Sequence, residues 1–150
     1  MRLAHIALVT GDLGRTRALY ERLGFLGGQV YEVEEQYPGE AVAHRYRAVA
    51  LRHAPEARPT LWVMEPVGAA GPLARFLRQR GPGFHHLGLK TEDIAGEVDR
   101  LSRQGLAFLR KPHDFPQDGE IRALLSPRAC DGVLIEIVQA RERVARVSDG

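Results

Sequence analysis

The sequence contains a single cysteine, Cys130. One thiol cannot form an intramolecular disulfide and cannot build a thiolate cage around a metal. No apolar run approaches the ~18 residues that a membrane helix needs. The apolar stretch near the N-terminus is also too short for a signal peptide, because Asp12 follows it closely. These absences predict a soluble protein of a reducing compartment, the cytoplasm, with no membrane partner.

Lysine is scarce as well, since only Lys90 and Lys111 are lysines among 21 basic residues. The arginines are scattered and form no stripe that alternates with aromatic residues, so we expect no nucleic-acid partner. The net charge is only +2. A length of 150 residues, with 44% hydrophobic and 27% charged residues, is typical of one globular domain.

The most informative feature present is an internal repeat. The segment HIALVTGDL from His5 resembles HLGLKTEDI from His86, and the two stay in phase, 81 residues apart, as far as Gly24 and Gly105. The matched pairs are His5/His86, Leu8/Leu89, Thr10/Thr91, Asp12/Asp93, Leu13/Ile94 and Gly24/Gly105. Such a repeat predicts two copies of one supersecondary unit.

Each copy has the same predicted order of elements. A short strand rich in aliphatic residues comes first, at about 3–9 and 85–90. Asp12 and Asp93 then supply the N-caps of amphipathic helices. Three further strands, separated by turn residues, complete each copy. The order therefore predicts two βαβββ modules and an α+β fold.

The predicted organisation is a single domain over residues 1–140. It comprises module one at about 1–67, a linker helix at about 70–80, module two at about 83–140, and a charged tail over 141–150. Within module two we expect a short strand near 106–110, ended by a turn at Pro112 and Asp114.

Three residues form a candidate metal site. Strand side chains alternate between faces, so if Ile6 and Leu8 pack on the helix, His5 and its repeat partner His86 lie on the opposite face. A pseudo-twofold axis would then bring the two histidines together. Glu136 lies in the apolar run VLIEIV, where a charge needs a partner. Two imidazoles and a carboxylate suit one divalent metal, Zn²⁺, Co²⁺, Ni²⁺, Mn²⁺ or Fe²⁺, and leave positions open for substrate.

Each of these residues alone also fits a structural role, as a hydrogen-bonded core histidine or a solvent-facing glutamate. Other histidines are predicted outside the site. Alternation places His85 on the face opposite His86. His44, His53 and His113 have no repeat partner and are expected at the surface.

The repeat and these three residues resemble the vicinal oxygen chelate superfamily, which includes glyoxalase I, methylmalonyl-CoA epimerase, ring-cleaving dioxygenases and bleomycin-resistance binding proteins. The likeness spans residues 3–139. The segments VMEPV from Val63, GPGFHHL from Gly81 and GVLIE from Gly132 are most similar to those of methylmalonyl-CoA epimerases. The resemblance implies paired βαβββ modules that form a curved mixed-sheet barrel around one metal site, and a homodimer.

The resemblance also implies metal ligands on the first and last strand of each module. These positions hold His5, Trp62, His86 and Glu136 in this chain. The epimerases and glyoxalases have Gln or Glu where this chain has Trp62, and an indole N–H can donate but cannot ligate. We expect Trp62 to form an apolar wall for the substrate. The remaining two histidines and one glutamate form the set that suits non-haem Fe(II) oxygenases.

The first functional hypothesis is a metal-dependent isomerase or epimerase that acts on a carbon acid, such as the acyl-CoA methylmalonyl-CoA, through a metal-stabilised enolate. Its candidate bases are Glu136 and, between the second and third strands, Glu34, Glu35 and Glu40. Arg47, with Arg45, is the candidate to bind a substrate carboxylate or phosphate. Two alternatives stay open, an Fe(II)-dependent dioxygenase and a non-catalytic small-molecule binding protein.

Overall fold

The computed structural model describes residues 1–37, 39–115 and 119–140, so the predicted charged tail at 141–150 lies outside the described residues. Module one contains β1 (Arg2–Val9), α1 (Leu13–Arg22), β2 (Leu26–Glu35), β3 (His44–Arg52) and β4 (Thr60–Pro66). The linker holds α2 (Pro72–Arg80). Module two contains β5 (Gly83–Lys90), α3 (Ile94–Arg103), β6 (Phe108–Phe115), β7 (Glu120–Leu125), a 3₁₀ turn (Pro127–Ala129) and β8 (Leu134–Ala140). The predicted α+β fold of two βαβββ modules is confirmed.

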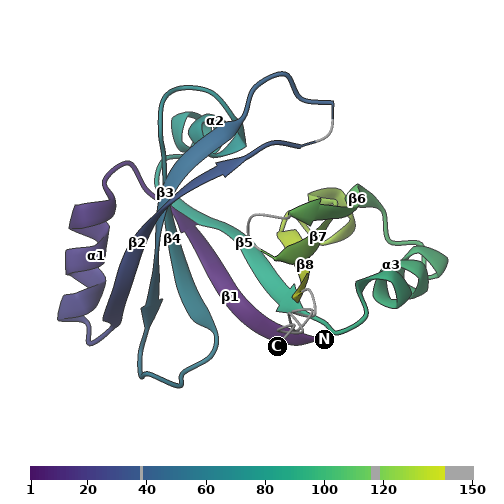
Figure 1. Cartoon of the computed structure of the whole chain (residues 1–150), viewed down its shortest axis with the longest axis horizontal. Helices are drawn as coiled ribbons and strands as arrows, with labels where there is room; N and C mark the ends of the chain where they lie inside the picture. The colour runs from purple at the N-terminus through teal and green to yellow at the C-terminus, as the bar shows by residue number, and fades with distance from the viewer. Residues whose placement is uncertain (38, 116–118, 141–150) are drawn as a thin grey trace, which may run out of the picture.

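One curled, mixed sheet of eight strands joins the two modules. The strand order is β2-β3-β4-β1-β5-β8-β7-β6. The two first strands, β1 and β5, pair antiparallel at the centre, and each pairs parallel with the last strand of its own module. Figure 1 shows module one on the left and module two on the right of this central pair, with α1 and α3 on the outer sides. Among the described residues, no helix has the length and apolarity to cross a membrane.

The register of β1 against β5 is symmetrical. The pairs are Leu3↔Leu89, His5↔Gly88, Ala7↔His86 and Leu8↔Phe84, with register shifts at both ends. Each shift leaves one residue without a partner across the pair, Ala4 in β1 and His85 in β5. These two positions are 81 residues apart, so the irregularity belongs to the repeated unit.

The two faces of β1 pack into different cores. Leu8 joins Leu13 of α1 in a cluster on the outer face, with Ile6 packed against it, as predicted. Ala7 and Val9 belong to a second cluster on the inner face, against which α2 packs. A third cluster lies under α3 in module two. This arrangement leaves His5 on the inner face.

The predicted turn at Pro112 is wrong, because β6 continues from Phe108 to Phe115. Proline has no N–H to donate, so it is confined to edge strands and bulges. The position of β6 at the edge of the sheet meets this condition. Register shifts between Phe108, Arg110 and His113 also interrupt its pairing with β7.

Both long helices start in the same way. The side chains of Asp12 and Asp93 accept hydrogen bonds from backbone N–H groups in the first turns of α1 and α3, each at 2.9 Å. A side chain from the last strand of the same module accepts one more, Glu65 in module one and Gln139 in module two. The repeated caps fix where each helix begins above the sheet.

We predict that Asp93→Ala lowers the free energy of unfolding by about 1 kcal/mol, because a free N–H of α3 loses its acceptor. Asp99→Ala on the same helix is the control, since Asp99 is exposed and pairs only with Arg103 among the described residues. Urea denaturation of both variants measures the difference. Equal values for the two variants would contradict the assignment of the cap.

Candidate metal centre

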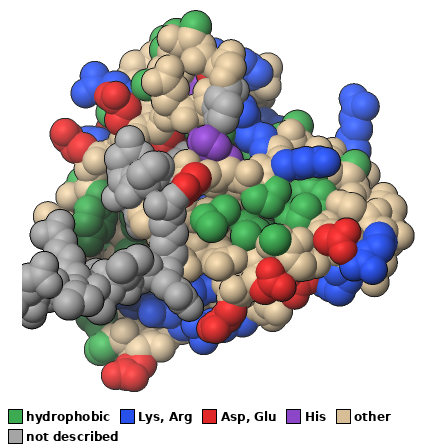
Figure 2. Space-filling model, turned by 45° about the vertical axis from the view of Figure 1, so that its right-hand side comes forward, with side chains coloured by type: hydrophobic (Ala, Val, Ile, Leu, Met, Phe, Trp, Pro, Cys, Tyr) green, Lys and Arg blue, Asp and Glu red, His purple; other side chains and the backbone are tan. Residues whose placement is uncertain are grey.

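Three strands bring the predicted ligands together. His5 comes from β1, His86 from β5 and Glu136 from β8. The two Nε2 atoms lie 3.0 Å apart, and Oε2 of Glu136 lies 3.2 Å from that of His5 and 3.4 Å from that of His86. All three side chains are largely buried, with 21%, 11% and 11% of their surface exposed in that order. Figure 2 shows a small area of histidine in a hollow on one face of the molecule.

The three donor atoms have the spacing that a single divalent cation requires. Zn–N and Zn–O bonds of about 2.1 Å place donors about 3.0 Å apart at a right angle and about 3.4 Å apart at the tetrahedral angle. The observed separations of 3.0, 3.2 and 3.4 Å span this range. The site therefore fits a metal held on one side by two neutral imidazoles and one carboxylate.

The charge of the cluster also favours a cation. Burial alone raises the pKa of Glu136, but hydrogen bonds from His5 and His86 and the charge of Arg122 bring it well below its usual range. The carboxylate is therefore ionised at neutral pH. Nε of Arg122 lies 3.9 Å from the second oxygen, Oε1. Oε2 faces the histidines, while Oε1 faces the guanidinium.

Gly88 makes room for the His5 ring. A Cβ at this position would lie 2.0–2.3 Å from three atoms of the imidazole. No side chain could be accommodated there unless His5 moved. Gly88 also pairs with His5 across the central strands, so the ring lies over its backbone. The absence of a side chain at this one position in β5 sets how closely His5 can approach His86.

His85 does not lie on the face that alternation predicts. The register shift at His85 makes it the extra residue of a β-bulge, and a bulge redirects the side chains next to it. Nδ1 of His85 is 2.9 Å from Nδ1 of His86. Its ring also meets the edge of Phe76 in α2 at a centroid distance of 5.0 Å. Burial, with a smaller effect of His86, lowers the pKa of His85 to about 4.

Trp62 occupies the position that the repeat makes equivalent to Glu136. In module one Ala7 pairs with Trp62, and in module two the equivalent Gly88 pairs with Glu136. The indole packs against the inner-face cluster and lies 6.2 Å from the ring of Tyr31. The fourth ligand position of the resemblance is thus filled by an apolar side chain.

Among the candidate bases outside the cluster, Glu35 contacts Arg122, which also lies beside Glu136. Its Oε1 accepts hydrogen bonds from Tyr46 at 2.8 Å and from Arg122 at 2.5 Å. Arg122 therefore lies between Glu35 of module one and Glu136 of module two. Burial lowers the pKa of Arg122, but Glu136, Glu35 and Glu120 raise it above its usual value overall, so the guanidinium stays charged.

Glu40 belongs to a neighbouring cluster. It pairs with His44 and with Arg110 of β6, whose guanidinium lies 4.0 Å from the ring centre of Tyr37. The hydrogen bond with His44 is the main cause that lowers the pKa of Glu40, and Arg110 adds to it. The predicted surface position of His44 is wrong, because its side chain is only 14% exposed.

The two remaining candidates lie apart from the cluster. Arg47 is on the outer face of the sheet, where its Nη2 pairs with Glu65 at 2.8 Å. Glu34 pairs with Arg45 on an exposed part of β2 and β3. The structure therefore brings together His5, His86, Glu136 and Glu35, but neither Arg47 nor Glu34.

Sequence reasoning did not identify Arg122, Gly88 or the bulge at His85. Gly88 has a small repeat partner, Ala7, which is a sign that both positions face a histidine. Arg122 has no comparable sign, because its contact with Glu35 joins residues 87 positions apart.

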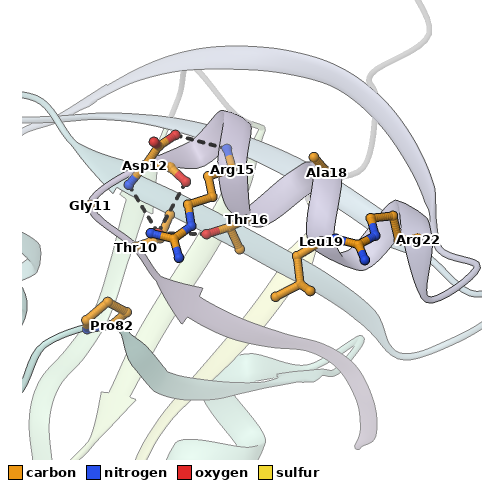
Figure 3. A pocket seen from close by; sticks show the side chains of 9 residues that line it. All are labelled: Thr10, Gly11, Asp12, Arg15, Thr16, Ala18, Leu19, Arg22 and Pro82. Carbon is orange, nitrogen blue, oxygen red and sulfur yellow. Dashed lines mark hydrogen bonds between the residues drawn. The ribbon is translucent and has the colours of Figure 1, made fainter.

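A hollow of about 680 Å³ lies beside the start of α1, away from the cluster. It is lined by Thr10, Gly11, Asp12, Arg15, Thr16, Ala18, Leu19, Arg22 and Pro82 (Figure 3). Figure 3 shows that Asp12 is already engaged as the helix cap. None of the three metal-ligand candidates lines this hollow.

Comparison with known proteins finds a matching family model, curated relatives and similar solved structures. The model of the glyoxalase/bleomycin resistance protein/dioxygenase superfamily matches residues 4–123. The human mitochondrial methylmalonyl-CoA epimerase is 28% identical over 140 residues, which are 93% of this chain and 74% of that protein. The methylmalonyl-CoA epimerase of Mycobacterium tuberculosis superposes with a TM-score of 0.73 at 24% identity, over 92% of this chain and 87% of that one. A Streptomyces coelicolor methylmalonyl-CoA epimerase variant, in complex with 2-nitronate-propionyl-CoA, gives 0.69 at 23% identity, over 93% and 97%.

We predict that Gly88→Ala abolishes or strongly weakens the binding of added Co²⁺, because the new methyl group must displace the His5 ring. Gly83→Ala is the matched control in the same strand, where a Cβ would have no neighbour within 4 Å. Isothermal titration calorimetry on both variants measures the effect. Wild-type affinity in Gly88→Ala would show that His5 is not held where the cluster needs it.

Proposed function

Because the chain belongs to the glyoxalase/bleomycin resistance protein/dioxygenase superfamily, we propose that it is a metal-dependent isomerase or epimerase. Its substrate would be a carbon acid such as methylmalonyl-CoA, and its reaction would proceed through an enolate. The observation that carries this proposal is the buried group of two imidazoles and one ionised carboxylate, with donor atoms 3.0–3.4 Å apart.

His5, His86 and Glu136 would hold the metal, with one ligand atom each. A divalent cation at this position supplies a Lewis acid that stabilises negative charge as it develops on a substrate oxygen. Three protein ligands would leave further coordination positions of the cation for two neighbouring oxygens of the substrate. Because the ligands are buried, the charge acts in a medium of low dielectric, where it is stronger than in water.

Epimerisation requires proton transfer on both faces of one carbon. We assign one face to Glu35 and the other to Glu136, which come from different modules and share Arg122. Tyr46 and Arg122 hold the carboxylate of Glu35 in one orientation. Glu40 is the alternative base, and its carboxylate is likewise held, by His44 and Arg110.

Trp62 would form the apolar wall of the substrate site, together with Tyr31. The names of relatives support an acyl-CoA as substrate, since they describe epimerases of methylmalonyl-CoA. Arg47 is not part of this proposal, because it pairs with Glu65 on the outer face. A homodimer and a cytoplasmic location stay predictions from the sequence.

Trp62 also favours a second candidate function, an Fe(II)-dependent dioxygenase. With an indole in the fourth ligand position, the two histidines and Glu136 form a facial set that leaves positions for both substrate and O₂. This hypothesis requires oxygen uptake that depends on substrate and Fe²⁺. The epimerase requires no oxygen.

We predict that the metal-loaded protein exchanges the α-proton of methylmalonyl-CoA in D₂O under anaerobic conditions. Glu35→Gln should slow the exchange of the epimer whose α-proton faces Glu35 by about 100-fold or more, since a positioned base contributes that much. Glu40→Gln should change it less than about tenfold. Proton NMR measures the exchange, and metal content and thermal unfolding of each variant show that the fold and the site persist.

Exchange that is lost in Glu40→Gln and kept in Glu35→Gln would transfer the base to Glu40. No exchange by the metal-loaded wild type would exclude this substrate. Oxygen uptake with a phenolic substrate and Fe²⁺ would then favour the dioxygenase. A wild-type protein with no affinity for any divalent metal would favour the binding-protein alternative.

A further inference from the structure

We propose that His85 is a positioning residue for the metal centre, whose Nδ1 accepts a hydrogen bond from Nδ1–H of His86. This contact would hold the His86 ring in the tautomer and the orientation that present Nε2 to a cation. The inference rests on the proposed metal-dependent function and extends it to a residue that makes no contact with the metal itself.

The proposed role of His86 as a metal ligand fixes the assignment of protons between the two rings. The Nδ1 atoms are 2.9 Å apart, and the rings are nearly perpendicular at 78°. One nitrogen must donate and the other must accept. His86 needs the lone pair of Nε2 for a metal, so its proton lies on Nδ1. Nδ1 of His85 is therefore the acceptor, and the proton of His85 lies on its own Nε2.

The local fold places His85 where it can make this contact. In a regular strand, neighbouring residues point to opposite faces, and the bulge at His85 removes this constraint. The edge-on contact with Phe76 then fixes the ring from the side of α2. Phe76 is in turn covered by the guanidinium of Arg80, 5.5 Å from its centroid. The helix therefore supports His85, and His85 supports His86.

The repeat provides an internal comparison. The equivalent bulge position in module one is Ala4, whose methyl group cannot accept a hydrogen bond. Only module two thus has a side chain at this position that can orient its histidine. A ligating histidine commonly donates its second N–H to a carboxylate, a carbonyl or water, and loss of that partner costs 10–100-fold in metal affinity. In this chain His85 would be the acceptor of that N–H of His86.

The test compares Co²⁺ binding by the wild type, His85→Phe and His85→Gln. Phenylalanine keeps the aromatic packing on Phe76 but removes the acceptor, so we expect about a 10–100-fold weaker affinity. Glutamine has an amide oxygen that can accept from His86, so we expect part of the affinity to return. His53→Ala removes an exposed histidine elsewhere and should bind as the wild type does. Calorimetry gives the affinity, and the visible absorption of bound Co²⁺ reports its ligand geometry.

Thermal unfolding of the metal-free variants separates positioning from packing. The proposal expects weaker affinity and a changed Co²⁺ spectrum in His85→Phe, with a melting temperature close to that of the wild type. Wild-type affinity and spectrum in His85→Phe would overturn the proposal. Equal losses of Co²⁺ affinity in His85→Phe and His85→Gln, accompanied by equal losses of stability, would also overturn it. If the wild type binds no Co²⁺ or other divalent metal, the proposed function fails and this inference fails with it. If the wild type binds and His85→Phe binds equally well, only this inference fails.

Discussion

The antiparallel pairing of β1 with β5 is the constraint on which the rest of the structure depends. It places the two copies of the repeat around a pseudo-twofold axis, so that the repeat partners His5 and His86 face the same space. It also sets His5 opposite Gly88 and His86 opposite Ala7, two positions with little or no side chain. The remaining strands extend outward from this pair, and β8 adds Glu136 beside it. A shift of this register by one residue would place His5 and His86 on opposite faces of the sheet.

Charge within the fold is balanced across the modules. Glu136 is a buried carboxylate, and such a group is tolerated only with partners. His5, His86 and Arg122 are those partners, and Arg122 also pairs with Glu35, which is itself buried. The network leaves Oε2 of Glu136 on the side of the histidines. Buried charges that shift one another's pKa values are concentrated at functional sites.

Much of the fold and the three proposed ligands could be predicted because they follow from the repeat and from strand alternation. Both are local patterns that survive in one sequence. The predicted face of His85 was wrong, because a bulge interrupts the alternation of side chains between the two faces of a strand. No residue type in this segment indicates the bulge. The course of β6 through Pro112 depends on its place at the sheet edge, which only the assembled topology reveals. The partners of Glu35 and His44 are set by contacts between distant segments, and composition and spacing do not encode such contacts.

The ion pair between Arg122 and Glu35 has a consequence for how such a chain can change over evolutionary time. It joins β7 of the second half to β2 of the first, so the buried carboxylate of Glu35 pairs with a cation that the other half supplies. After the duplication, drift at either position would have been tolerated only with a matching change at its partner. We therefore expect positions 35 and 122 to covary among close homologues. Such covariation would mean that the two modules no longer evolve independently.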